Sequence, residues 1–133
     1  MSRESDPKEW RRFAEIDRRA ARHLLEAGDY EACAFHCQQA IEKLLKAIIV
    51  KQTTQKPVHT HDLRALLEEL KDIEVSPEIA SLVSNIDIYY IGTRYPLDVA
   101  DPNVFKKPLA ESAVGQADKV FEWFLAQINF GAE

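Results

Sequence analysis

The hydrophobic and polar positions of the chain repeat with the period of an α-helix, most clearly between Tyr30 and Lys51. No glycine or proline interrupts this segment, so we expect one long helix at the centre of the fold. Its apolar and small residues recur every three or four positions, as on one buried helix face: Tyr30, Cys33, Ala34, Cys37, Ile41, Leu44, Leu45, Ile48 and Ile49. A second set lines up along one polar side: His36, Gln39, Lys43 and Lys46.

A first helix is expected before this segment. Asp6 can cap it, and Pro7 suits the first helical position. Gly28 can take the left-handed conformation that ends a helix, and Asp29 can cap the next one. So short a turn predicts an antiparallel hairpin of the first two helices.

Three further helices are expected after Lys51. Thr60 is expected to cap a short helix that begins near Asp62, and Ser76 to cap a fourth helix. A last helix is expected from about 108 to 129, after a loop of about a dozen residues without periodicity. No segment alternates as a strand does. The predicted fold class is therefore all-α, an up-and-down bundle of four to five helices, with residues 1–133 forming a single domain.

The apolar face expected for the first helix contains one charged residue, Asp17. The other members of that face are Trp10, Phe13, Ala14, Ala21 and Leu24. A carboxylate on a buried face needs a cation or hydrogen-bond donors beside it. Either the edge of the face is wet at Asp17, or Asp17 faces Lys43 and Lys46 of the next helix, or Arg94, and helps to build a site.

Composition narrows the classes of function. The chain has 133 residues, 46% of them hydrophobic, and a formal net charge of −5, so any nucleic-acid contact has to be a local patch. No apolar run approaches the roughly 18 residues that cross a bilayer. The N-terminus is polar and lacks the core of a signal peptide. We therefore expect a cytoplasmic protein that does not engage a membrane.

The cysteines and histidines do not form a convincing metal site. Cys33 and Cys37 lie one helical turn apart and are expected to be small buried side chains. His36 lies beside them, but a closed zinc site needs four ligands and no paired second cluster follows. His59 and His61 form an H-x-H pair in a polar linker, where loop or capping roles are expected rather than metal binding. We predict no metal and no cofactor.

Three stretches together resemble the HEPN domain family, the "higher eukaryotes and prokaryotes nucleotide-binding" domain. The first combines a helical W-x-x-x-A pattern at Trp10 and Ala14 with GDYEACAFHCQQAIEKLLKA at 28–47. The second is H-D-L at 61–63, and the third is YYIGTRYP at 89–96. The resemblance implies a compact helical bundle, usually a homodimer, that associates with a nucleotide or RNA. It also implies a partner, a minimal nucleotidyltransferase, in a two-gene module of toxin–antitoxin type.

The chain departs from the ribonuclease branch of that family, which carries an R-x4-6-H motif. Arg94 lies near the expected place, but no histidine follows it, and His61 is the last in the chain. The pair Arg18 and His23 matches by letter only, because five residues turn a helix by about 140° away from the starting direction. We therefore assign no catalytic residue and favour a non-enzymatic module. The alternatives are a metal-independent ribonuclease that pairs Arg94 with Asp98, Tyr95 or His61, and a purely structural dimer.

Residue chemistry suggests where a ligand would bind. An arginine offers a planar fork of donors to phosphate, lysines offer point charges, and tyrosines can stack on a base. No glycine-rich phosphate loop is present, which excludes a P-loop ATPase. The same side chains can instead have structural roles or make dimer contacts. The candidate ligand-binding residues are Arg94, Tyr95, Tyr90, Lys43, Lys46, Gln39 and Asp17.

Overall fold

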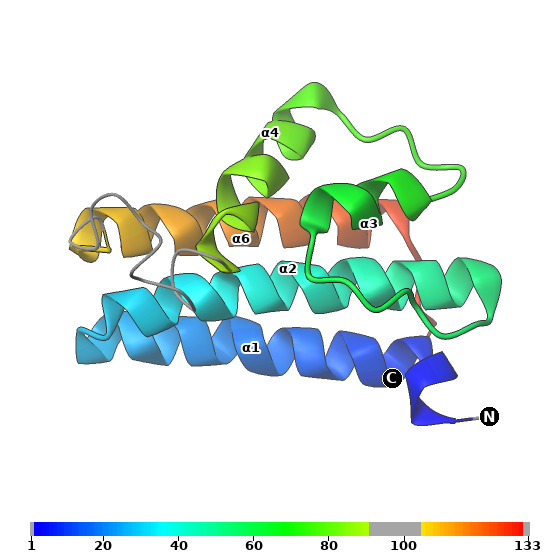
Figure 1. The fold of residues 1–133 in the computed structure, drawn as a ribbon, viewed down its shortest axis with the longest axis horizontal. Coiled ribbons are helices and arrows are strands. Elements are labelled where there is room, and N and C mark those ends of the chain that lie inside the picture. The colour runs from blue at the N-terminus through cyan, green and yellow to red at the C-terminus, as the bar shows by residue number, and fades with distance from the viewer. Residues whose placement is uncertain (1, 91–104, 132–133) are drawn as a thin grey trace.

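The computed structural model describes residues 2–90 and 105–131, and within them it contains helices and no strand. A short 3-10 helix, η1 (Arg3–Ser5), precedes the first of five α-helices (Figure 1). The α-helices are α1 (Pro7–Ala27), α2 (Tyr30–Thr53), α3 (Leu63–Glu69), α4 (Pro77–Asp87) and α6 (Lys107–Gln127). The expectation of an all-α bundle is confirmed. None of the described helices is both long enough and apolar enough to cross a membrane.

Helices α1 and α2 form the antiparallel hairpin that the sequence predicts (Figure 1). The Asp6 side chain caps α1 by accepting from the Lys8 amide. Gly28 ends α1 with φ of 81°, a conformation that a residue with a Cβ adopts only at a cost. Asp29 occupies the N-cap position of α2, but its side chain makes no capping hydrogen bond.

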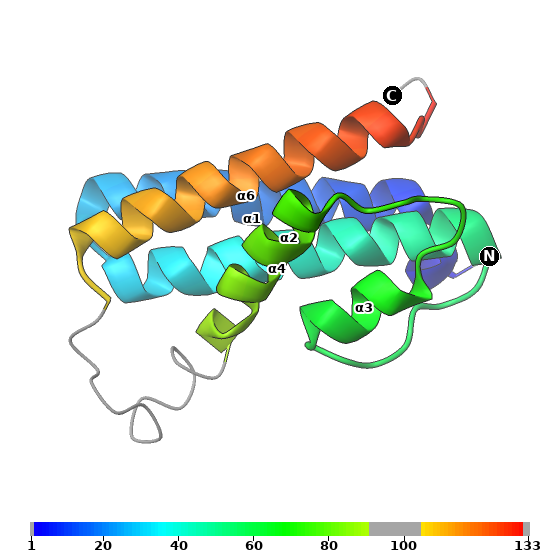
Figure 2. The same ribbon diagram turned by 90° about the horizontal axis from the view of Figure 1, so that it is seen from above.

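Helix α6 runs alongside the hairpin, so three long helices form the body of the bundle (Figure 1). The connection after α2 runs back along that helix before α3 begins, and α4 then crosses α2 and α6 obliquely (Figure 2). Helices α3 and α4 therefore cover the side of α2 that faces away from α1, and α2 contacts every other long element.

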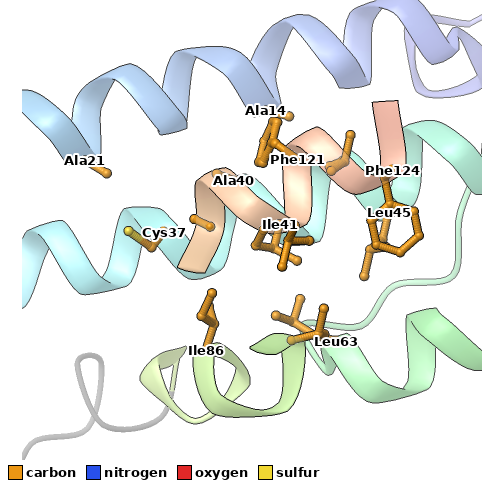
Figure 3. Close-up of a cluster of buried hydrophobic side chains, with 14 of the residues drawn as sticks. Ala14, Ala21, Cys37, Ala40, Ile41, Leu45, Leu63, Ile86, Phe121 and Phe124 are labelled. Atoms are coloured by element: carbon orange, nitrogen blue, oxygen red, sulfur yellow. The ribbon is translucent and has the colours of Figure 1, made fainter. Parts of the chain in front are cut away.

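The hydrophobic core surrounds α2, as its predicted central position requires. Figure 3 shows side chains from α1, α2, α4 and α6 that converge there, including Ala14, Ile41, Ile86 and Phe121. Phe121 and Phe124 are completely buried, and each such side chain contributes about 1.5–3 kcal/mol of hydrophobic stabilisation. Cys33 and Cys37 are buried and free, as predicted. Because partners cover α2 on several sides, three polar residues of this helix are buried too: Gln38, Glu42 and Lys46.

Two further local predictions were wrong. Helix α3 is capped by Asp62, whose carboxylate accepts from the amides of Arg64 and Ala65, and not by Thr60. The Thr60 hydroxyl instead accepts from the amide of Asp62. Phe13 was assigned to the core, yet it is 37% exposed because it lies at the outer edge of the face.

Candidate functional site

Asp17 lies on the buried face of α1 and is only 7% exposed. Its two carboxylate oxygens contact two side chains of α2. The Nζ of Lys43 donates to Oδ2, and the Nδ1 of His36 lies 2.8 Å from Oδ1. The sequence left open whether Asp17 sits at a wet edge or faces the lysines of the second helix. The contact with Lys43 confirms that it faces that helix. Lys46 has a different partner.

Burial by itself would raise the pKa of Asp17, because a carboxylate is less stable away from water. The hydrogen bonds from His36 and Lys43, together with their charges, outweigh that effect and hold the pKa below its usual value. Asp17 is therefore an anion at neutral pH.

Glu42 forms a second cluster of the same kind. This carboxylate is 3% exposed. Its Oε2 accepts from the Nζ of Lys46 at 3.0 Å, and its Oε1 lies 2.8 Å from the Nδ1 of His61. The Nε2 of Gln39 is 3.5 Å from the same Oε1. A residue of the linker between α2 and α3 is thus fastened to the middle of α2.

Both clusters balance their charges internally. Each contains one carboxylate, one lysine and one histidine, so with neutral histidines the four formal charges of Asp17, Lys43, Glu42 and Lys46 cancel. Lys46 is itself buried, and its Nζ lies 5.6 Å from the centre of the Trp10 ring. A lysine that already has a carboxylate partner attracts a phosphate less than a lysine without one. The main role of the clusters is therefore to hold neighbouring elements together, and they leave little positive charge for a ligand.

An aromatic row runs beside the two clusters. The rings of His61 and Tyr90 are stacked, with centroids 4.3 Å apart and planes 14° apart. Phe35 follows Tyr90 at 6.1 Å, and His36 follows Phe35 at 5.5 Å. The row links the histidine of one cluster to the histidine of the other across the end of α4.

A cavity of about 560 Å³ opens at the N-terminal end of α2, next to this row. Phe35, Tyr30 and Phe105 supply aromatic surface to its wall, and Asp29 and Glu31 supply two carboxylates. The apolar rings suit a flat, uncharged group, whereas the two carboxylates disfavour a phosphate.

The predicted site residues fall into three groups. Asp17, Lys43, Lys46 and Gln39 belong to the paired clusters. Gln39 also donates to the Oε1 of Gln38 at 2.7 Å. Tyr90 belongs to the aromatic row. Arg94 and Tyr95 lie outside the described residues, and the contact of any of these residues with a ligand stays a prediction.

Sequence reasoning missed the contact between Glu42 and His61. Nineteen positions separate the two residues in the chain. The sequence signal that could have indicated this contact was Glu42 itself, a glutamate at the edge of the apolar face of the second helix. Among the described residues, no group of three or more histidine, cysteine, aspartate or glutamate side chains is arranged to hold a metal ion.

Comparison with known proteins finds solved structures with a similar fold. The structure resembles the crystal structure of TT1696 from Thermus thermophilus, with a TM-score of 0.84, 27% identity and coverage of 92% of this chain and 98% of that one. It also resembles ST0689, described as an archaeal HEPN homologue, with a TM-score of 0.75, 25% identity and coverage of 97% and 100%. The comparison with curated proteins finds no match.

The family model of the HEPN domain matches residues 7–128, which span every α-helix described above. The three stretches on which the resemblance was based lie within that range. The chain belongs to the HEPN domain family.

Proposed function

We propose that this chain is a homodimeric HEPN module that associates with a nucleotide or RNA and works with a minimal nucleotidyltransferase in a two-gene system of toxin–antitoxin type. The observation that carries the proposal is the family match over residues 7–128. The missing histidine after Arg94 favours a binding module over a ribonuclease.

The polar side of α2 supports the part of the proposal that concerns a ligand. Gln39, Lys43 and Tyr90 are each partly exposed, and they combine an amide, a cation and an aromatic ring. Tyr90 precedes Arg94 by four positions in the sequence. We assign phosphate contact chiefly to Arg94, because Lys43 and Lys46 already pair with carboxylates.

Light scattering tests the dimer and partner parts of the proposal. The expected mass is twice that of the 15.2 kDa chain. Co-expression with a nucleotidyltransferase encoded next to this chain is expected to give a complex that elutes together in gel filtration. A monomer that captures no such partner contradicts the module.

Fluorescence anisotropy with a labelled single-stranded RNA tests the nucleic-acid part. Binding is expected to weaken when Arg94→Ala removes a phosphate contact, and to weaken further as salt rises. Arg64→Ala is the matched control, because Arg64 is an exposed arginine on α3 and is not one of the candidate ligand-binding residues. Equal loss in both variants would indicate a general charge effect and contradict the site.

One observation favours a second candidate, a metal-independent ribonuclease. The Nδ1 of His61 is held by the buried Glu42, an arrangement that orients an imidazole for proton transfer at its other nitrogen. If this candidate is right, the purified protein cleaves single-stranded RNA in the presence of a chelator. The substitutions Arg94→Ala and His61→Ala each abolish that cleavage. Cleavage that persists in either variant rules the candidate out.

A further inference from the structure

We propose that the exposed face of His61 is a stacking platform for the nucleobase of a bound nucleotide, with a preference for purines. The inference rests on the proposed association with a nucleotide and names the part of the ligand that the described residues recognise. The sequence suggested Tyr90 and Tyr95 for this role. The aromatic row favours His61 over Tyr90, and Tyr95 lies outside the described residues.

The geometry of the row explains the reassignment. Tyr90 has the His61 ring stacked on one side at 4.3 Å, and Phe35 lies 6.1 Å away with its plane tilted by 32°. Among the described residues, His61 is the last ring of the row, and 53% of its side chain is exposed. A planar base placed on His61 would continue the nearly parallel stack that Tyr90 and His61 already form.

His61 is held in place before any ligand arrives. Its Nδ1 lies 2.8 Å from the Oε1 of Glu42, and its carbonyl oxygen accepts from the Nε2 of Gln38 at 2.9 Å. Both partners are buried on α2. Because ring and backbone are anchored separately, stacking a base costs little conformational entropy.

The charges around His61 also favour a base over a phosphate. Glu42 is an anion against the imidazole, and Lys46 neutralises that anion from inside the bundle. Asp62 and Asp87 lie at the start of α3 and the end of α4. These four described residues together carry no excess positive charge, so recognition by the described part of the site depends on ring overlap. Larger rings overlap more, which gives the preference for purines.

Calorimetric titrations of ATP, UTP and inorganic triphosphate into the full chain test the proposal. The wild type is expected to bind ATP more tightly than UTP, and both more tightly than triphosphate. His61→Ala is expected to raise the Kd for ATP about tenfold, since stacking on one aromatic side chain contributes about that much. His61→Phe keeps a ring and is expected to retain the preference for ATP.

His59→Ala is the matched control, because His59 is an exposed histidine two positions earlier in the same linker. It is expected to bind ATP as the wild type does. Thermal melts of each variant separate loss of stacking from loss of folding. If His61→Ala keeps the wild-type Kd and the same ratio of ATP to UTP binding, the stacking platform is wrong and nucleotide association stands. Equal affinity of the wild type for ATP and triphosphate would also show that the stacking platform is wrong. Failure of the wild type to bind either nucleotide overturns the stacking platform and the nucleotide part of the proposed function, and leaves the RNA and partner parts to their own tests.

Discussion

Asp17 is a carboxylate on the buried face of α1, and it stays ionised because Lys43 and His36 surround it. Glu42 repeats the arrangement with Lys46 and His61. A buried ion pair adds little net stability compared with apolar side chains of the same size. Removing one partner alone is costly, however, because it strands the other charge. Each cluster therefore fixes how neighbouring elements fit together.

Asp17→Asn keeps the volume of the side chain and removes its charge. We expect it to lower the free energy of unfolding by roughly 2–4 kcal/mol, because Lys43 loses its buried anionic partner. Denaturant unfolding followed by circular dichroism measures the change. Asp118→Asn on α6 is the matched control. Asp118 pairs with Arg18 and Arg22 at a more exposed position, so its loss is expected to cost at most about 1 kcal/mol. Equal costs at the two sites would contradict the account.

The lowered pKa of Asp17 predicts a pH dependence. Its folded-state pKa lies below the unfolded value of about 3.9, so its contribution to stability is present above that pH. The contribution is lost as the pH falls through the folded-state pKa. The difference in Tm between the wild type and Asp17→Asn is therefore expected to shrink in melts between pH 5 and pH 2. A constant difference over that range would mean that folding leaves the pKa of Asp17 unchanged.

Asp87 is expected to behave in the opposite way. Burial raises its pKa, and the nearby Asp62 carboxylate adds to the effect. A raised folded-state pKa gives a contribution that is present below the unfolded value and lost as the pH rises through the folded one. Asp87→Asn can still accept the Leu63 amide, which Asp87 now accepts at 2.8 Å. The variant is expected to gain Tm relative to the wild type at pH 7, and less at pH 3. A loss at pH 7 would contradict the assignment.

One of the two clusters, that of Asp17, could be predicted from the sequence. A carboxylate within an apolar stripe must find a cation, and for Asp17 the lysines of the adjacent helix were the candidates. The pairing of Glu42 with His61 could not be predicted in the same way. It depends on how far the linker after α2 runs back along that helix, and helical periodicity contains no information about that path.

At the scale of elements, the glycines of α1 and α6 have opposite roles. Gly28 has φ of 81° and ends a helix. Gly115 is inside α6, and a Cβ added there meets no atom within 4 Å. This open space means that no close helix approach requires a glycine at this position, and that Gly115 only weakens the helix.

Gly115→Ala is therefore expected to raise the free energy of unfolding by about 0.8–1 kcal/mol, the difference in helix propensity. Gly28→Ala, the matched control, is expected to lower it, because alanine is strained at a positive φ. Chemical denaturation of both variants measures the sign of each change in the free energy of unfolding. Destabilisation by Gly115→Ala would show that α6 approaches another surface at that position.

The long helices were predictable because each carries a sustained apolar stripe and a clear start or stop. The start of α3 was less predictable. Thr60 and Asp62 are both good N-cap residues two positions apart, and the sequence does not decide between them. Docking against α2 and α4 decides it, since Leu63 becomes fully buried as the first residue of α3 and its amide bonds to Asp87. Tertiary contact selects the cap here.

At the scale of the whole molecule, the net charge suits a module that binds its ligand through a small local patch. The chain carries a net charge of −5, and the clusters on α2 are neutral when their histidines are neutral. A nucleotide or RNA would therefore be held by a few directed contacts and not by a broad positive field. The family match over residues 7–128 supports the same kind of module.

A calorimetric titration of ATP into the wild type and into Arg94→Ala tests this account most directly. The account predicts saturable micromolar binding to the wild type and at least a tenfold weaker Kd for Arg94→Ala, since a charge-assisted contact to phosphate contributes about 1.5–3 kcal/mol. Absence of ATP binding to the folded wild type would contradict it, as would an unchanged Kd for Arg94→Ala.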